Sequence, residues 1–240
     1  MILGPIAGFE TVSKTIIGGS FKEEFVYMRV LFDYSGHIHS NKISDSIGDR
    51  YMNLTTFSSL KGHFLMAMPS LSDPNFEHSV TCISEHTTDG AFGIVINRLF
   101  EGLNAKVIFD ELAIEYNEHA KKIPVHIGGP VHTNELFVLH GAPFHGDGLL
   151  MVNDGLALDN SRRVLEDIAA GRGPKQYIIA LGCAGWGGGQ LEWEMKQNAW
   201  LTIPCVPDIL FELPVEDRWE SAIKRLGIDP DLLSGEAGNA

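Results

Sequence analysis

A chain of 240 residues, 44% hydrophobic and 20% charged, has the composition of a soluble protein with one domain, or with one domain and an appendage. No apolar run approaches the roughly 18 residues that a membrane-spanning helix needs, and the first residues lack the basic start of a secretory signal. We therefore expect a cytoplasmic protein without a membrane partner. The net charge of −13 disfavours direct binding to nucleic acid, because an acidic surface repels phosphate.

Residues 1–51 differ from the rest of the chain. They are rich in turn-forming segments such as IGGSF and DYSGHIHS, and they carry no sustained periodicity. We predict an N-terminal extension here, either disordered or the product of a mis-assigned translation start, with Met52 as the alternative start. Residues 52–240 are predicted to form a single domain.

The first predicted elements after this extension are strands. HFLMAMP is a short apolar run that ends at Pro69, and the segments SVTCISEH and AFGIVINR read as two strands around an Asp-Gly turn. Residues 104–120 have apolar side chains at helical spacing, with Asn104 as the N-cap. The basic pair Lys121-Lys122 follows. Like Arg162-Arg163 further on, it is interpreted as a solvated helix end and not as a nucleic-acid contact.

Strands and helices alternate in the second half of the chain. Two strands flank a Gly-Gly-Pro bend, and a further strand enters a turn before a helix and a strongly apolar strand. The predicted strands are 124–129, 135–141, 149–158 and 176–182, and the predicted helices are 160–171, 189–200 and 215–227. Because hairpins occur as well as strand–helix units, the pattern predicts an α+β fold with a mixed, largely antiparallel sheet.

A glycine-rich segment, Gly182–Gln190, lies between a predicted strand and a predicted helix. Such a bend can direct backbone N–H groups at a phosphate. However, no lysine follows the glycines, their spacing does not match G-x-G-x-x-G, and Glu192 and Glu194 follow at once. We therefore interpret the segment as a close-packed corner around Trp186, braced by Gln190.

Cys183 is the one thiol inside this segment. A position between a strand and a helix N-terminus lowers a thiol pKa, but G-C-A-G is not the spacing of a nucleophile elbow. We therefore favour Cys183 as a small residue fitted into a crowded corner over Cys183 as a nucleophile. The chain's three cysteines form no C-x-x-C pair, and its histidines form no H-E-x-x-H motif. The sequence predicts no metal site, no cofactor and no complete catalytic set.

Several separate blocks carry a resemblance to a known family. They include SEHTTDGAFGIVINR, HIGGPV, FVLHG and GCAGWGGGQLEWEMKQNAWL, in order from about residue 60 to about residue 229. This arrangement resembles the AlgH/YqgE-like family of bacterial proteins. The resemblance implies a bifurcated, partly barrel-like β-sheet surrounded by helices. It implies no catalytic residue, and the family's biochemical role is not established.

The family name derives from a proposed role in the transcriptional regulation of alginate synthesis. The first hypothesis is accordingly a non-enzymatic cytosolic binding module or an indirect regulator, with a protein partner or a second copy of the chain as possible partners. The alternative is a small-molecule or nucleotide binder, or a thiol-dependent enzyme, that uses the Gly128–Pro130 and Gly182–Gln190 loops. The candidate site consists of Glu85, His86, Asn97, Gly128, Gly129, Pro130, Cys183, Gly185, Trp186 and Gln190.

Overall fold

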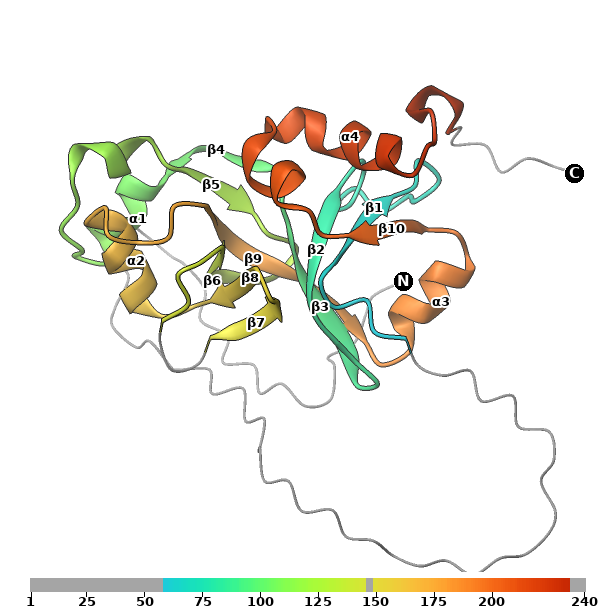
Figure 1. Cartoon of the computed structure of the whole chain (residues 1–240), viewed down its shortest axis with the longest axis horizontal. Helices are drawn as coiled ribbons and strands as arrows, with labels where there is room; N and C mark the ends of the chain where they lie inside the picture. The colour runs from blue at the N-terminus through green and yellow to red at the C-terminus, as the bar shows by residue number, and fades with distance from the viewer. Residues whose placement is uncertain (1–57, 146–148, 234–240) are drawn as a thin grey trace, which may run out of the picture. The chain divides into compact units, whose positions relative to one another are not determined.

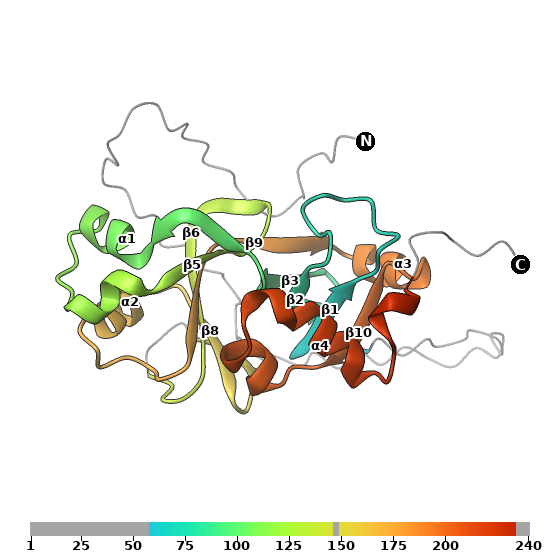
Figure 2. The same cartoon turned by 90° about the horizontal axis from the view of Figure 1, so that it is seen from above.

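Ten strands join one mixed β-sheet, with short helices packed on its outer surfaces (Figures 1 and 2). The computed structural model describes residues 58–145 and 149–233. The predicted extension, residues 1–51, lies outside the described residues. No helix within the described part is both long and apolar enough to cross a membrane.

The strands follow one another in the order β10-β1-β2-β3-β9-β6-β8-β7, and β4 and β5 extend the sheet from β9. Among the described strands, only β5 and β9 pair in parallel, and every other pair is antiparallel. The strands are β1 (His63–Ala67), β2 (Val80–Thr87), β3 (Gly90–Val95), β4 (Leu99–Asn104), β5 (Pro124–Ile127), β6 (Val131–His140), β7 (Leu150–Asn153), β8 (Leu156–Asp159), β9 (Tyr177–Gly187) and β10 (Trp200–Pro204).

Strand β9 belongs to both arms of the sheet. Its first half pairs with β5 and β6, and its last four residues pair with β3. The sheet therefore divides along β9 and does not close into a barrel. This confirms the expected α+β class with a mixed, largely antiparallel, bifurcated sheet.

The division occurs at Gly182. Before Gly182, the even-numbered residues Ile178 and Ala180 face the core that contains Trp219. After it, the odd-numbered Cys183 faces that core, and the even-numbered Trp186 faces the opposite core. Side chains in a strand alternate between faces, so this change requires one residue out of step. Gly182 has φ of 77°, a left-handed conformation that favours glycine, and it lies opposite the register shift between Val131 and Leu136 of β6.

The Gly-Gly-Pro bend passes directly over Gly182 and Cys183, and we call this contact the main-chain crossing. A Cβ on Gly128 would lie 2.1 Å from the carbonyl oxygen of Gly182, and one on Gly129 would lie 2.3 Å from the carbonyl carbon of Cys183. Gly128 also donates its N–H to Leu181 O and accepts from Val95 N, each at 2.8 Å. The ends of β3 and β5 are thus tied to β9 through main-chain contacts alone.

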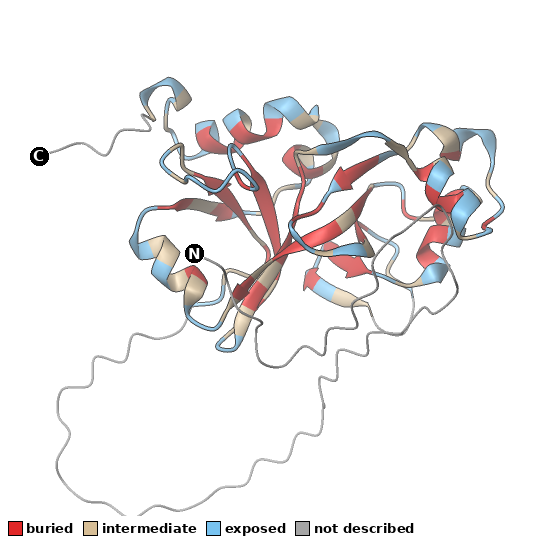
Figure 3. Ribbon diagram, turned by 180° about the vertical axis from the view of Figure 1, so that it is seen from behind, coloured by how far each residue is buried: buried red, intermediate tan, exposed pale blue. Residues whose placement is uncertain are grey.

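Four α-helices lie outside the strands in the described residues. Helices α1 (Ala105–Glu111) and α2 (Arg162–Ala169) share one core, α3 (Gln190–Lys196) packs on a second, and α4 (Arg218–Arg225) packs on a third. In Figure 3 the central strands are buried, whereas the outward faces of the helices are exposed. The single-turn helices that the argument uses are η1 (Glu118–Lys122) and η2 (Asp208–Glu212).

Several predicted boundaries are wrong. Gly182–Gln190 is not a loop: β9 continues to Gly187, and only two residues turn before α3. Residues 149–158, predicted as a strand that enters a turn, form a hairpin, because a second strand, β8, follows the turn. The helix predicted over 104–120 ends at Glu111, and its N-cap, Asn104, makes no side-chain cap bond. The predicted helix over 189–200 ends at Lys196, because Trp200 begins β10.

The main-chain crossing predicts effects of very different size on stability for alanine at two motif glycines. We expect Gly128→Ala to lower the free energy of unfolding by about 3 kcal/mol or more, or to prevent folding, because the new methyl meets a backbone oxygen that cannot move aside. Gly185→Ala is the matched control, since its Cβ would meet only Val131 Cγ2 at 3.4 Å. The free energy of unfolding of Gly185→Ala, measured by urea denaturation, should stay within about 1 kcal/mol of the wild-type value. Equal free energies of unfolding for the two variants would contradict the close main-chain contact at Gly128.

Candidate functional site

The predicted site residues fall into four groups in the structure. The main-chain crossing brings Gly128 and Gly129 against Cys183. Gly185, Trp186 and Gln190 lie around the end of β9. The remaining groups are Glu85 with His86 on β2, and Asn97 after β3. Pro130 is exposed beside the crossing.

The segments predicted to converge on a ligand do meet, but they meet as close-packed backbone. The distances of 2.1 and 2.3 Å from virtual Cβ positions to the opposite chain leave no space between the two glycines and β9. Asn97 does not face the crossing. Its Oδ1 accepts from Val80 N and its Nδ2 donates to His78 O, both at 2.8 Å, so its amide braces the start of β2.

Cys183 is a buried residue of the sheet and not an activated thiol. It lies within β9, not at a helix N-terminus, and it is only 4% exposed. Burial, together with the negative charge of Glu135, raises the pKa of its thiol to about 12. Because the thiolate is the nucleophilic form, Cys183 is a poor nucleophile at neutral pH.

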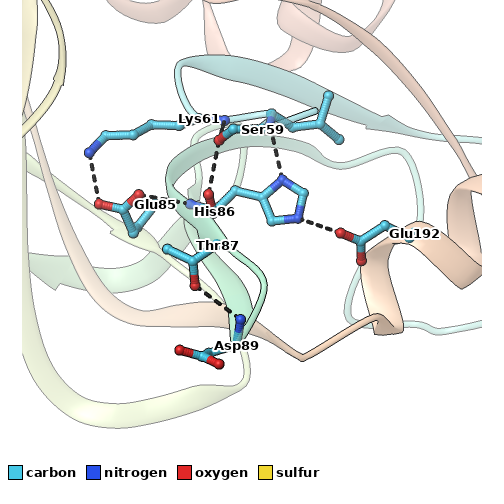
Figure 4. A network of polar contacts seen from close by, with 8 residues as sticks. Ser59, Lys61, Glu85, His86, Thr87, Asp89 and Glu192 are labelled. Carbon is cyan, nitrogen blue, oxygen red and sulfur yellow. Dashed lines mark hydrogen bonds and ion pairs between the residues drawn. The ribbon is translucent and has the colours of Figure 1, made fainter. Parts of the chain in front are cut away.

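Glu85 and His86 belong to a polar network that joins β2 to α3 and to the segment before β1 (Figure 4). Glu85 pairs with Lys61 at 2.7 Å on the more exposed side. The His86 imidazole is buried, and its Nε2 lies 3.0 Å from Glu192 Oε1. A bulge between Ile83 and Glu85 shifts the register of β2 just before this pair.

The geometry determines which nitrogen of His86 carries the proton. Leu60 N lies 2.9 Å from His86 Nδ1, and a backbone amide can only donate. Nδ1 is therefore the acceptor, so Nε2 carries the proton and donates to Glu192. With its basic nitrogen engaged by Leu60, His86 holds three segments together and is not available as a general base.

Trp186 and Gln190 converge on a residue that the sequence interpretation treated only as a repulsive charge. Glu194 Oε2 accepts from the indole N–H groups of Trp186 at 2.9 Å and Trp200 at 2.8 Å. Glu194 Oε1 accepts from Gln190 Nε2 at 2.9 Å, and Gln190 Oε1 accepts from Gly187 N at 3.1 Å. As predicted, Gln190 braces the turn and the indole N–H is bonded nearby, and one carboxylate satisfies two buried indoles.

No group of three or more metal-ligating side chains in the described residues is arranged to hold a metal ion. The three cysteines are free thiols. Cys82 and Cys205 lie 3.3 Å apart, sulfur to sulfur, and burial together with Cys82 raises the pKa of Cys205.

A pocket of about 340 Å³ lies elsewhere, between η1, β5, the start of β9 and η2. It includes none of the predicted site residues. Its polar lining consists of His119, Lys122, His126, Lys175, Gln176 and Tyr177. The burial of His126, together with the charge of Arg218, lowers its pKa to about 4, so the imidazole is neutral at pH 7.

The sequence interpretation missed this pocket because its residues are scattered from 119 to 211. Lys122 was interpreted as a solvated helix end, and it does stand at the end of η1. One signal was available: His126 follows Val125 in a short strand beside two glycines. A histidine in a strand with a neighbour on each side is expected to be buried, and here the neighbouring strands are β4 and β9.

Comparison with known proteins agrees with the motif order. The profile of the AlgH-like family matches residues 64–231. The chain belongs to the AlgH-like family. It is 49% identical over 181 residues to a UPF0301 protein of Desulforapulum autotrophicum, covering 75% of this chain and 96% of that protein. A UPF0301 protein of Thioalkalivibrio sulfidiphilus is 48% identical over 187 residues, covering 78% of this chain and 100% of the relative.

The solved structures agree with this membership. The solution structure of the AlgH protein from Pseudomonas aeruginosa superimposes with a TM-score of 0.63 at 44% identity, covering 79% of this chain and 100% of that one. A Corynebacterium diphtheriae protein has a TM-score of 0.57 at 22% identity and covers 72% of this chain and 90% of its own, which supports the fold alone. The names of these relatives state no biochemical activity.

The buried imidazole gives the AlgH-like domain a specific acid sensitivity. His126 titrates near 6.5 when unfolded and near 4 when folded, so between these values only the unfolded chain takes up the proton. The contribution of neutral His126 to the free energy of unfolding is complete above about pH 6.5, and it falls as the pH drops toward 4. We expect the wild type to lose about 2–3 kcal/mol more than His126→Phe between pH 7 and pH 4 in urea denaturation. Parallel losses in both proteins would contradict the assignment.

Proposed function

We propose that this AlgH-like chain is a cytoplasmic, non-enzymatic binding protein, and that any effect it has on transcription is indirect. The observation that carries the proposal is the internal use of the motif side chains. His86 bonds to Leu60 and Glu192, Asn97 bonds to the backbone before β2, and Glu194 bonds to two buried indoles. These groups build a rigid framework, whereas a catalytic site needs groups that face a substrate.

The charge distribution supports the indirect part of the proposal. The net charge is −13, and eight Lys and Arg side chains of the described part ion-pair with carboxylates. Cations that are already paired are less available to displace counterions from DNA. The three free thiols fit a reducing compartment.

The alternative is a thiol-dependent enzyme or a nucleotide binder that uses Gly128–Pro130 and Gly182–Gln190. Fewer observations support this alternative. Main chain fills the crossing between the two segments, and Cys183 is buried with a raised pKa. A phosphate at the start of α3 would also lie near Glu192, which stands in the first helical turn.

Alkylation of the native protein tests the non-enzymatic part. We expect iodoacetamide at about pH 8 to leave Cys183 unmodified in the folded chain and to modify it in urea, because burial suppresses the thiolate. Mass spectrometry of peptides gives the extent at each cysteine. A Ser70→Cys variant is the control, since residue 70 is exposed and its thiol should react in the native state. Fast, stoichiometric modification of native Cys183 would favour the thiol enzyme.

Titration of labelled DNA tests the indirect part. We expect binding of the purified chain at moderate salt to be weak and equal for unrelated duplexes, because the acidic surface repels phosphate. Fluorescence anisotropy with a specific and a scrambled duplex measures the difference. Tight binding to one sequence, at least about a thousandfold above the scrambled duplex, would show direct recognition.

A further inference from the structure

The pocket between η1, β5, β9 and η2 contains a buried histidine without a hydrogen-bond partner. His126 is 4% exposed, and neither of its ring nitrogens has a hydrogen-bond partner in the described residues. The backbone of Ile179 lies close enough to favour the protonated ring, but it does not reach hydrogen-bond geometry. Buried polar atoms are normally bonded, so an unsatisfied imidazole in the wall of a pocket is a candidate hydrogen-bonding group for a ligand.

The lining of this pocket is cationic in a strongly acidic protein. It includes His119, Lys122 and Lys175 and no Asp or Glu side chain, although the chain contains 31 acidic residues. Lys122 and Lys175 form no ion pair with a carboxylate of the described part, in contrast to eight other Lys and Arg side chains. The two lysines are therefore available to a ligand's negative charge.

A buried guanidinium adds positive charge behind the histidine. Arg218 is 5% exposed and donates to the carbonyl oxygens of Ile96 and Leu213. Within the described residues no carboxylate forms an ion pair with it, and its charge acts on His126. The charge of Glu216 also acts on Arg218, but without an ion pair, so the buried guanidinium still favours an anion nearby.

The rest of the lining is apolar and aromatic. Ile123, Ile178 and Phe211 line the pocket beside the half-buried ring of Tyr177. A cavity of about 340 Å³ with a few polar groups on an apolar wall has the size and character of a small-molecule site.

We propose that this pocket binds a small organic anion, with a carboxylate or phosphate head and an apolar body. Lys122 and Lys175 supply charge, and His126 supplies a hydrogen bond. Because the imidazole nitrogens are covered, the ring turns toward the ligand when it binds. The inference rests on the proposed binding function and assigns it a ligand class and a location.

Titrations with benzoate and phenyl phosphate, at ionic strength matched with sodium chloride, test the site in the full chain. We expect shifts of backbone amide signals for residues 122–126 and 175–179 in NMR spectra, with a shift of the His126 ring. Inorganic phosphate should bind more weakly than phenyl phosphate, because it lacks the apolar body.

Matched variants show whether binding occurs at this pocket. Lys175→Ala should weaken affinity about tenfold, the effect of losing one charge-assisted contact. His126→Phe should remain folded and lose the interaction, because phenylalanine fills the space without a donor. Lys121→Ala is the control: it removes a neighbouring lysine that does not line the pocket and should bind as the wild type does. Equal affinity in all four proteins, or no shift with any probe at about 10 mM, would overturn the inference.

The same samples separate this inference from the proposed function. Release of phenol from phenyl phosphate, lost in His126→Phe, would leave the site in place and overturn the non-enzymatic proposal. Absence of binding, with Cys183 unreactive in the native state, would overturn the site and leave the non-enzymatic proposal standing.

Discussion

The main-chain crossing at Gly182 is the constraint on which the rest of the structure depends. Strand β9 belongs to both arms of the sheet, its side chains change faces at the division, and the left-handed Gly182 makes this change in one step. The crossing chain must then approach so closely that it carries no side chain, and Gly128 and Gly129 meet this requirement. The glycine-rich motifs are therefore explained by chain geometry before any ligand is considered.

The polar motif residues secure the segments that this division leaves apart. Helix α3 packs beyond the end of β9, and two carboxylates tie it back: Glu192 to His86 of β2, and Glu194 to Trp186 and Trp200. Glu192 thereby fixes α3 against β2, and Glu194 fixes it against β9 and β10. A carboxylate that accepts from buried indoles leaves no costly unpaired donor in an otherwise apolar core.

The sequence was informative where local periodicity determines structure and less so where tertiary contacts do. The hairpin around Asp89, the buried strand at 177–182 and the helix after Ser161 were predicted correctly, because turn chemistry, apolar runs and capping residues are local. The continuation of β9 through Cys183 was not predicted, because glycines favour turns unless another strand pairs with them. Here β3 provides that pairing. The raised pKa of Cys183 likewise depends on a tertiary contact, its burial within β9, and not on the adjacent helix.

The anion pocket is linked to the crossing through β5. His126 lies two residues before Gly128, on a strand held between β4 and β9 and fixed at its end by the glycine contacts. A strand held on both edges cannot shift to bring its histidine to solvent, which explains how an unsatisfied imidazole persists inside a stable sheet. The desolvation of His126 is then a cost of folding, present before any ligand arrives, so a ligand that completes its hydrogen bonds offsets a cost that the fold has already met. The rigidity imposed by two glycines thus supports the candidate binding site, although neither glycine lines the pocket.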